Sequence, residues 1–287
     1  KRAAGLAGFV VRESAQTLRD PQHLVNTAVS TGVITAAGAA VLARLLVIPK
    51  DRSSSFRGPL GTSKRVVWSE GVDIAQVKAI GASTGSTIND VLVAAVSGAL
   101  SIYMQERGDS LASGDLRAMV PVNLRDPDAA LGLGNEFGLV YLSLPVSIAD
   151  PLQRLYEVKR RMDVLKRSPE AVITYQVLNL LGSLPGELAS QAVELFAAKA
   201  SAVLTNVPGP RQTLYFVGKP IRNLMFWVPQ SGDIGMGISI ISYANVVTLG
   251  LMIDGLLVDD PERIMVLFQH EFDTLTALTH QLSTMPA

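Results

Sequence analysis

Apolar residues recur at helical spacing directly after the polar stretch Thr87-Ile88-Asn89-Asp90. They form one face of a helix that we predict to end near Gln105, namely Ile88, Val91, Leu92, Ala95, Ala99 and Ile102. Thr87 and Asp90 have the spacing of a capping box, in which both side chains accept hydrogen bonds from backbone N–H groups at the helix start. Asn89 lies on the first turn, where the helix dipole favours negative ligands. Two interpretations stay open: Asn89 and Asp90 only cap a core helix, or they present polar groups to a cleft.

The hydrophobic pattern along the rest of the chain mixes helices and strands without strict alternation. The further predicted helices are 3–18, Asp73–Ala82, Pro151–Lys166, Ser168–Leu181, Pro185–Lys199 and a last one from Asp260-Pro261 to about Leu282. The predicted strands are Arg65–Ser69, Leu116–Val122, Gly138–Val146, Ala202–Thr205, Leu214–Val217, Ile221–Trp227, Gly237–Tyr243 and Val246–Ile253, the last two joined as a hairpin through Ala244-Asn245. This order predicts an α+β fold, or a mixed-sheet α/β fold. We predict two regions, an N-terminal helical segment and linker at 1–63 and a lobe at 64–287.

The segment Leu24–Ala43 contains no Asp, Glu, Lys or Arg and has roughly the length that spans a bilayer. It is rich in alanine and carries several Ser, Thr and Gly residues, which add little to membrane insertion. We therefore expect a helix that is buried, or that lies against a membrane surface or another domain. A transmembrane anchor is the alternative.

The composition changes this picture in three ways. The chain is 48% hydrophobic and 17% charged, below the roughly 25% charged residues of typical soluble domains, which indicates a lipid-handling surface or a large interface. Lys plus Arg equals Asp plus Glu at 25 each, so the net charge argues against non-specific nucleic-acid binding. The absence of cysteine excludes disulfides, thiolate catalysis and cysteine metal sites.

No motif supplies a complete catalytic set. The three histidines are His23, His270 and His280, and none has the spacing of a zinc-binding pair; His270 and His280 are interpreted as surface residues of the last helix. We therefore predict no metal site and no cofactor. Asp254-Gly255 is interpreted as a tight turn after a strand. The basic residues at 159–161 and 166–167 are either a solvated helix face or a patch that meets phosphate.

Several motifs in order resemble the C-terminal portion of the bacterial wax ester synthase/diacylglycerol acyltransferase family. Asn89-Asp90-Val91-Leu92-Val93-Ala94 is similar to the family's Asn-Asp-Val-Val-Leu-Ala element, and Pro121-Val122-Asn123-Leu124-Arg125 resembles the strand end that follows it. The other matching stretches are Gly134–Gly138, Leu204–Pro210 and Ile241-Ser242-Tyr243…Asp254. The likeness covers nearly the whole chain.

The resemblance implies one lobe of the two-lobed fold of chloramphenicol acetyltransferase and peptide-synthetase condensation domains. It implies transfer of an acyl group from the co-substrate acyl-CoA to a diacylglycerol or a long-chain alcohol, which yields triacylglycerol or wax esters. It also implies a cytoplasmic protein that associates peripherally with the inner face of the cell membrane or with lipid inclusions.

One family motif is absent from this sequence, the active-site His-His-x-x-x-Asp-Gly, because the chain has no adjacent histidines. The chain also starts at Lys1 without an initiator Met, so we expect a part of a longer polypeptide whose missing N-terminal lobe supplies the histidine base. No catalytic residue is then expected in this chain. The resemblance places Asn89, Asp90, Asn206, Pro208 and Gly209 at a substrate tunnel or at the interface between lobes. A non-catalytic lipid-binding or scaffold protein of the same fold is the alternative.

Overall fold

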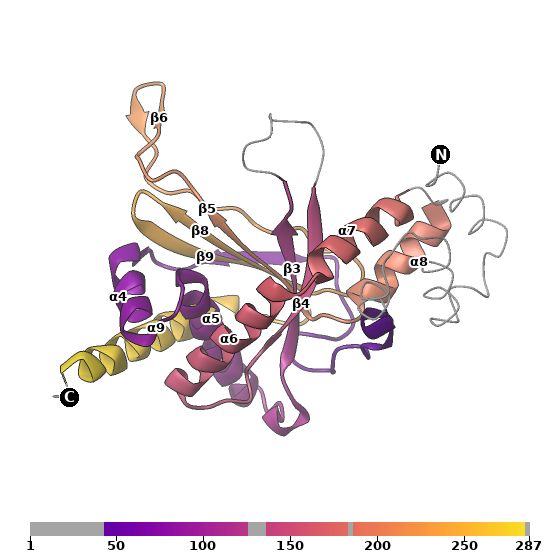
Figure 1. Cartoon of the computed structure of the whole chain (residues 1–287), viewed down its shortest axis with the longest axis horizontal. Coiled ribbons are helices and arrows are strands. Elements are labelled where there is room, and N and C mark those ends of the chain that lie inside the picture. Colours follow the sequence, from indigo (N-terminus) through magenta and orange to yellow (C-terminus); the bar gives the residue numbers. More distant parts are fainter. Residues whose placement is uncertain (1–42, 126–135, 183–185, 285–287) are drawn as a thin grey trace.

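A single mixed sheet organises the computed structural model, which describes residues 43–125, 136–182 and 186–284 (Figure 1). Its order is β1-β9-β8-β5-β3-β4, with the short strand β2 also paired to β9. Strand β5 runs parallel to both β3 and β8, whereas the β3–β4, β8–β9 and β1–β9 pairs are antiparallel. The predicted α+β class is confirmed. The predicted helix 3–18 and almost all of Leu24–Ala43 lie outside the described residues.

The elements follow the predicted order closely. The strands are β1 Lys64–Trp68, β2 Val72–Asp73, β3 Leu116–Asn123, β4 Phe137–Leu144, β5 Ala202–Pro208, β6 Tyr215–Phe216, β7 Lys219–Pro220, β8 Met236–Tyr243 and β9 Val246–Asp254. The helices are α4 Ile74–Thr84, α5 Ile88–Glu106, the 3-10 turn η1 Leu111–Ser113, α6 Pro151–Arg167, α7 Glu170–Leu181, α8 Gly186–Ala197 and α9 Pro261–Thr284. The predicted hairpin between β8 and β9 is confirmed, and Ala244 and Asn245 at its turn both have positive φ.

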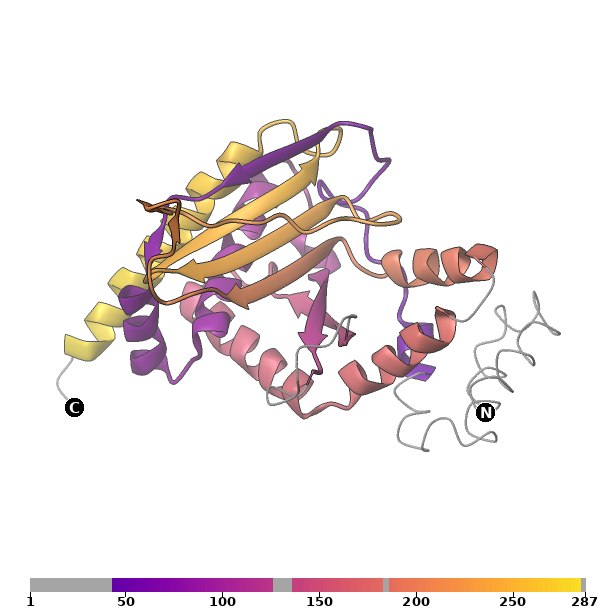
Figure 2. The ribbon, with the colours of Figure 1, turned by 90° about the horizontal axis from the view of Figure 1, so that it is seen from above.

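Helix α5 is the centre of one layer. Its capping box is confirmed, because Thr87 N–H donates to Asp90 Oδ2 (2.8 Å) and Asp90 N–H donates to Thr87 Oγ1 (3.3 Å). The helix is long and apolar enough to cross a membrane, but 78% of that stretch is buried inside the lobe, where α4, α6 and α9 pack around it. Figure 2 shows the long gold helix α9 running alongside the sheet. The apolar character of α5 is thus explained by burial on all sides.

A buried ion pair joins the helices of this layer. Arg154 of α6 is 2% exposed and donates to Glu271 of α9, and it also donates to the carbonyl of Ile148 (2.8 Å). The pair lies against Gly98 of α5, where a Cβ atom would overlap the Glu271 carboxylate. Gly98 is therefore required for close packing of α5 against α9.

The other face of the sheet is covered by an extended segment at 221–231. We predicted a strand at Ile221–Trp227, and this prediction is wrong, because the segment crosses β8 and β9 instead of pairing along an edge. The Phe226 carbonyl accepts from the Ser239 hydroxyl (2.5 Å), and a Cβ atom at Gly237 would lie 2.6 Å from the Val228 carbonyl. The small residues Gly237 and Ser239 on β8 thus let the segment lie close to the sheet. The Ser239 hydroxyl supplies a hydrogen bond to it in place of the backbone pairing of a strand.

The described part of the predicted segment 1–63 is anchored to the lobe. Asp51 accepts from Arg117 N–H (2.9 Å) and from the Ser201 hydroxyl (2.7 Å), and Phe56 is fully buried in the main core. Lys199, 2% exposed, donates to the carbonyls of Leu45 (2.5 Å) and Leu46 (2.8 Å) in the helical turn 43–47. Burial lowers the pKa of Lys199, and nearby Arg117 lowers it further. The boundary at residue 63 stays a prediction.

Candidate functional site

Two asparagines meet at one edge of the sheet. Asn206, at the end of β5, donates from its side-chain amide to the side-chain oxygen of Asn89 on the first turn of α5. Asn89 is exposed and Asn206 is half-buried. Two of the five residues that the resemblance places at a substrate tunnel or lobe interface are therefore in direct contact.

The pleat of β5 explains why Asn206 reaches α5. Ala202 and Leu204 are buried in the main core beneath the helices, and alternate residues of a strand point to the same face. Asn206 therefore points to the α5 side, beyond the last buried position of the strand. The start of α5 is fixed in turn by its capping box.

Asp90 and Asn89 have different surroundings. Asp90 is fully buried; its Oδ2 accepts from Thr87 N–H, and its Oδ1 has no hydrogen-bond partner. The cap is thus made by Thr87 and Asp90, and Asn89 is free of that task. Of the two interpretations for this stretch, capping applies to Asp90, whereas the Asn89 side chain faces the sheet edge.

Pro208 and Gly209 act through their backbone. Strand β5 ends at Pro208, which is exposed, and Gly209 N–H donates to the Ser242 carbonyl of β8 (2.8 Å). A Cβ atom at Gly209 would overlap that carbonyl oxygen. These residues hold the turn after Asn206 close to β8, and the structure gives neither of them a functional side chain.

β3, β5 and β8 run in one direction, and β3 and β8 also end in polar residues. Asn123 and Tyr243 alternate with the core residues Ala118 and Ile240, so their side chains point to the face opposite α5. Asn123 ends β3 and accepts from Arg125 N–H (3.0 Å) through its side chain. Tyr243 ends β8, and its hydroxyl donates to the Ile221 carbonyl and accepts from Leu214 N–H, both at 2.8 Å. The carboxyl ends of parallel strands are a common place for ligands in open sheets. We call this group of strand ends, with the start of α5, the Asn89–Asn206 edge.

The surface position predicted for His270 and His280 is confirmed, because both are exposed on α9. Among the described residues no group of three possible metal ligands occurs, and the expected lack of a metal site stays a prediction. Asp254 does stand at a turn, but it is also fully buried, and it accepts from Lys64 Nζ (2.6 Å) and from the N–H groups of Gly61 and Leu256. Although burial raises its pKa, these donors lower it to below the ordinary value.

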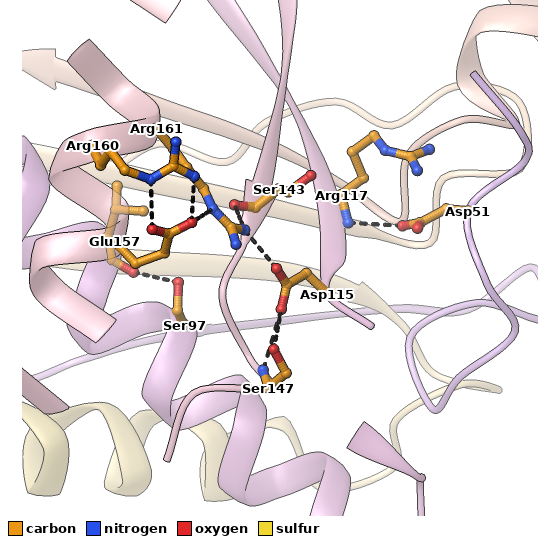
Figure 3. Close-up of polar contacts among 10 residues, drawn as sticks. Asp51, Ser97, Asp115, Arg117, Ser143, Ser147, Glu157, Arg160 and Arg161 are labelled. Atoms are coloured by element: carbon orange, nitrogen blue, oxygen red, sulfur yellow. Dashed lines mark hydrogen bonds and ion pairs between the residues drawn. The ribbon is translucent and has the colours of Figure 1, made fainter. Parts of the chain in front are cut away.

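The basic cluster on α6 is paired with acids. Glu157 accepts from Arg160 and Arg161, and Arg161 also donates to Asp115 (2.6 Å), as Figure 3 shows. These hydrogen bonds lower the pKa of Glu157 to about 2, Arg160 having the largest effect. Lys159 and Lys166 both pair with Asp163. Four of the five basic residues are thus paired with carboxylates of the protein itself, which favours the solvated-face interpretation over a phosphate patch.

The Asn89–Asn206 edge can orient a substrate but cannot take a proton from it. Carboxamides donate and accept hydrogen bonds and do not titrate at physiological pH. General-base chemistry would need a group such as histidine, and both described histidines lie on α9. The two carboxamides can therefore hold a polar group by hydrogen bonds but cannot accept its proton.

Comparison with known proteins identifies the class. The WS/DGAT C-terminal domain family matches residues 133–276. A Mycobacterium tuberculosis protein named as a probable diacylglycerol O-acyltransferase is 30% identical over 244 residues, which are 83% of this chain and 52% of that protein. The solved wax ester synthase/diacylglycerol acyltransferase of Marinobacter aquaeolei VT8 superposes with a TM-score of 0.62 at 19% identity, over 86% of this chain and 57% of that one.

The same fold occurs in a condensation domain. The domain that mediates chain release from the enacyloxin polyketide synthase superposes with a TM-score of 0.51 at 15% identity, over 88% of this chain and 48% of that one. The fold is thus one that acyltransferases and condensation domains share. Within that class, the chain belongs to the wax ester synthase/diacylglycerol acyltransferase family and contains its C-terminal domain. It spans about half the length of the curated relatives that it matches.

Proposed function

We propose that this chain is the C-terminal part of an acyl-CoA-dependent O-acyltransferase that makes triacylglycerol from diacylglycerol, wax esters from long-chain alcohols, or both. Its relatives are named diacylglycerol O-acyltransferase and O-acyltransferase WSD, which supports this substrate class. In this proposal the histidine base belongs to a part of the polypeptide outside this chain. No metal or other cofactor takes part, and acyl-CoA is a co-substrate.

The contact between Asn89 and Asn206 is the observation that carries the proposal. The contact uses the Asn89 oxygen as acceptor, so Asn89 retains N–H donors, and Asn206 retains its oxygen as an acceptor. An acyl transfer places negative charge on the thioester carbonyl oxygen, which pre-aimed N–H donors stabilise. We assign to Asn89 a donor role toward the acyl carbonyl and to Asn206 the task of holding the Asn89 amide in place.

Attack on the thioester needs a base that removes the proton from the acceptor hydroxyl, while the CoA thiolate leaves. The described residues at the edge include no histidine, so in this proposal the reaction requires both halves of the active site. The test compares acyl transfer from palmitoyl-CoA to diacylglycerol, and to hexadecanol, by this chain alone and by a polypeptide extended upstream. Activity of this chain alone would contradict the proposed division of labour.

A non-catalytic lipid-binding or scaffold role is the second candidate, favoured by the absence of a histidine among the described residues of the edge. It predicts that the extended polypeptide binds long-chain acyl-CoA or diacylglycerol without turnover. An upstream sequence that lacks adjacent histidines would support this role, and turnover in the assay above would exclude it.

We also propose peripheral association with a membrane or lipid droplet on the cytoplasmic side. The β6–β7 hairpin projects from the body of the lobe (Figure 1), and Tyr215, Phe216 and Val217 at its tip are 69%, 73% and 86% exposed. Exposed aromatic and aliphatic side chains enter the headgroup region of bilayers. Vesicle flotation of the extended polypeptide should fall when Phe216 and Val217 are changed to Ser; unchanged flotation would contradict the tip as the membrane contact.

A further inference from the structure

Two strands form the side edges of the sheet, β1 on one side and β4 on the other. Side chains close the β4 edge. The N–H groups of Leu139 and Tyr141 donate to side chains of α7 (2.8 and 3.0 Å), and the Ser143 carbonyl accepts from Arg161 (2.8 Å). These contacts occupy the backbone groups that a further strand would need, so the β4 edge is protected.

The β1 edge is open, and Figure 2 shows β1 in purple along the border of the sheet. Two hydrogen bonds fix its pairing with β9: Ser69 N–H donates to the Leu249 carbonyl, and Gly255 N–H donates to the Ser63 carbonyl, both at 2.9 Å. Backbone groups of an antiparallel strand alternate between its two sides. No described residue hydrogen-bonds to the backbone groups of β1 that point away from β9, which belong to Lys64, Val66 and Trp68.

The open edge also carries exposed apolar side chains. Val67 lies in the core beneath the helices, so its neighbours Val66 and Trp68 face the other side of the sheet. They are 43% and 52% exposed. Trp68 contacts Trp227 of the segment 221–231 edge-to-face, with ring centroids 6.3 Å apart. A strand added to β1 would thus find free backbone partners beside a fixed apolar surface.

A hollow of about 310 Å³ lies at the end of this edge. Trp68 and Glu70 line it from the β1 side, Thr248 lines it from β9, and Asn223 and Met225 line it from the segment 221–231. The hollow therefore joins the open strand to the outer face of the sheet.

Glu70 gives the hollow a negative charge. The basic residues of β1, Lys64 and Arg65, are already paired with carboxylates of their own chain. Glu70 is exposed, and it forms no salt bridge with any described residue. A cationic side chain in the hollow would meet both this carboxylate and the indole ring of Trp68, which attracts cations.

We propose that the β1 edge binds an extended segment of a partner protein, which adds one strand to the sheet and places a Lys or Arg side chain in the hollow beside Glu70. The segment is short, because the outward groups span only Lys64 to Trp68. Beyond them the chain has one residue more than β9 before β2 begins, and this bulge ends the regular edge. Backbone pairing provides the affinity, and the charge in the hollow selects the partner.

The test titrates the 287-residue chain with labelled peptides of about nine residues, in which Thr and Val alternate around a central Arg, Gln or Glu. Fluorescence anisotropy should show the Arg peptide binding at least about threefold more tightly than the Gln peptide, and the Glu peptide most weakly. Both tryptophans of the chain lie at the site, so its intrinsic fluorescence should change as well. Equal binding of the three peptides, or no binding of the Arg peptide at about 1 mM, would overturn the proposal.

Backbone methylation separates strand pairing from a simple charge contact. Two versions of the Arg peptide carry N-methyl groups on one or the other alternate set of residues. In an added strand only one set donates to β1, so one version should lose at least about tenfold in affinity and the other should stay within about threefold. Equal effects in the two versions would contradict strand addition.

Matched variants of the chain locate the site. Glu70→Gln should weaken the Arg peptide about two- to fivefold, as expected for an exposed ion pair, and leave the Gln peptide unchanged. Glu187→Gln makes the same change at an exposed glutamate of α8 and should alter neither peptide. Val66→Pro removes an outward N–H that β9 does not use and should weaken every peptide. Thermal unfolding checks each variant, and unchanged binding in folded Glu70→Gln and Val66→Pro would overturn the assignment.

Two further measurements identify the occupant of the edge. Analytical ultracentrifugation should show that the natural chain and Val66→Pro have the same mass; a dimer that Val66→Pro dissociates would make a second copy the occupant and overturn the proposal. The polypeptide extended upstream should bind the Arg peptide as tightly as this chain does. Loss of binding there would show that the upstream part covers β1, which would also overturn it. None of these measurements depends on acyl transfer.

Discussion

Asn206 and Asn89 are separated by 117 positions in the sequence, and their side chains share a hydrogen bond at one edge of the sheet. The strand β5 brings one of them there and the capped start of α5 brings the other. Neither residue belongs to the cap itself. Because Thr87 and Asp90 make the cap, substitutions at Asn89 can test its proposed role in the reaction without removing the cap.

Asn89→Ala should reduce turnover of the extended, active polypeptide about tenfold or more, which corresponds to roughly 1.4 kcal/mol of barrier. Its free energy of unfolding should fall by no more than about 1 kcal/mol, because it loses one exposed hydrogen bond and leaves the cap intact. The control is Thr87→Ala, which removes the cap and should lower stability by about 0.5–2 kcal/mol with turnover per folded molecule nearly unchanged. Steady-state kinetics and urea unfolding of both variants distinguish the two roles. Normal turnover in a folded Asn89→Ala variant would show that Asn89 has no part in the reaction.

Gly98→Ala should destabilise the lobe by about 1–3 kcal/mol, because the added methyl group overlaps the Glu271 carboxylate beside Arg154. Gly186→Ala is the matched control: this glycine of α8 is exposed, and the space that its added methyl group would enter is open. We expect it to be neutral or stabilising by up to about 1 kcal/mol. Thermal unfolding measures both, and equal stability of the two variants would show that α5 and α9 can separate without penalty.

Glu170→Gln should change how stability depends on pH. Glu170 is fully buried, and burial raises its pKa above the ordinary 4.5, although Tyr141 N–H and Arg44 partly offset this. A raised pKa in the folded state means that the contribution of Glu170 is fully present below about pH 4.5 and is lost as pH rises through the raised value. Glutamine keeps the acceptor for Tyr141 N–H without the charge. The variant should therefore gain stability relative to the natural chain as pH rises above about 4.5, measured by urea unfolding across about pH 4–8; a difference independent of pH would contradict this.

Asp254→Asn should have the opposite pH signature. Despite its burial, the donors from Lys64, Gly61 and Leu256 hold the pKa of Asp254 below its ordinary value of 3.8. Its contribution is present above that value and lost as pH falls through the lowered one. The variant should lose about 1.5–3 kcal/mol at about pH 7, as expected for hydrogen bonds to a charged group, and less near pH 2. The same unfolding series measures this, and Glu262→Gln, on an exposed residue of α9, provides a surface-charge control.

The sequence by itself determined the local elements. The period of apolar residues, the Thr87–Asp90 capping box and the Ala244-Asn245 turn each depend on neighbours within a few positions, and the structure confirms the helix, the cap and the hairpin they predict. The strand predicted at Ile221–Trp227 failed because its apolar residues cover the sheet from outside. The apolar pattern predicts that such residues are buried. It does not predict whether they are buried as part of a strand or as an extended segment packed on the face of the sheet.

Only the tertiary structure decided which distant residues meet. The order β1-β9-β8-β5-β3-β4 brings Asn206 to Asn89 and leaves β1 as an open side edge of the sheet. The buried partners Arg154 with Glu271, and Lys199 with the turn 43–47, had no local signal, because lysine, arginine and glutamate are usually exposed. Local free energies fix helices and turns along the chain, whereas contacts between residues more than a hundred positions apart depend on how the whole sheet pairs.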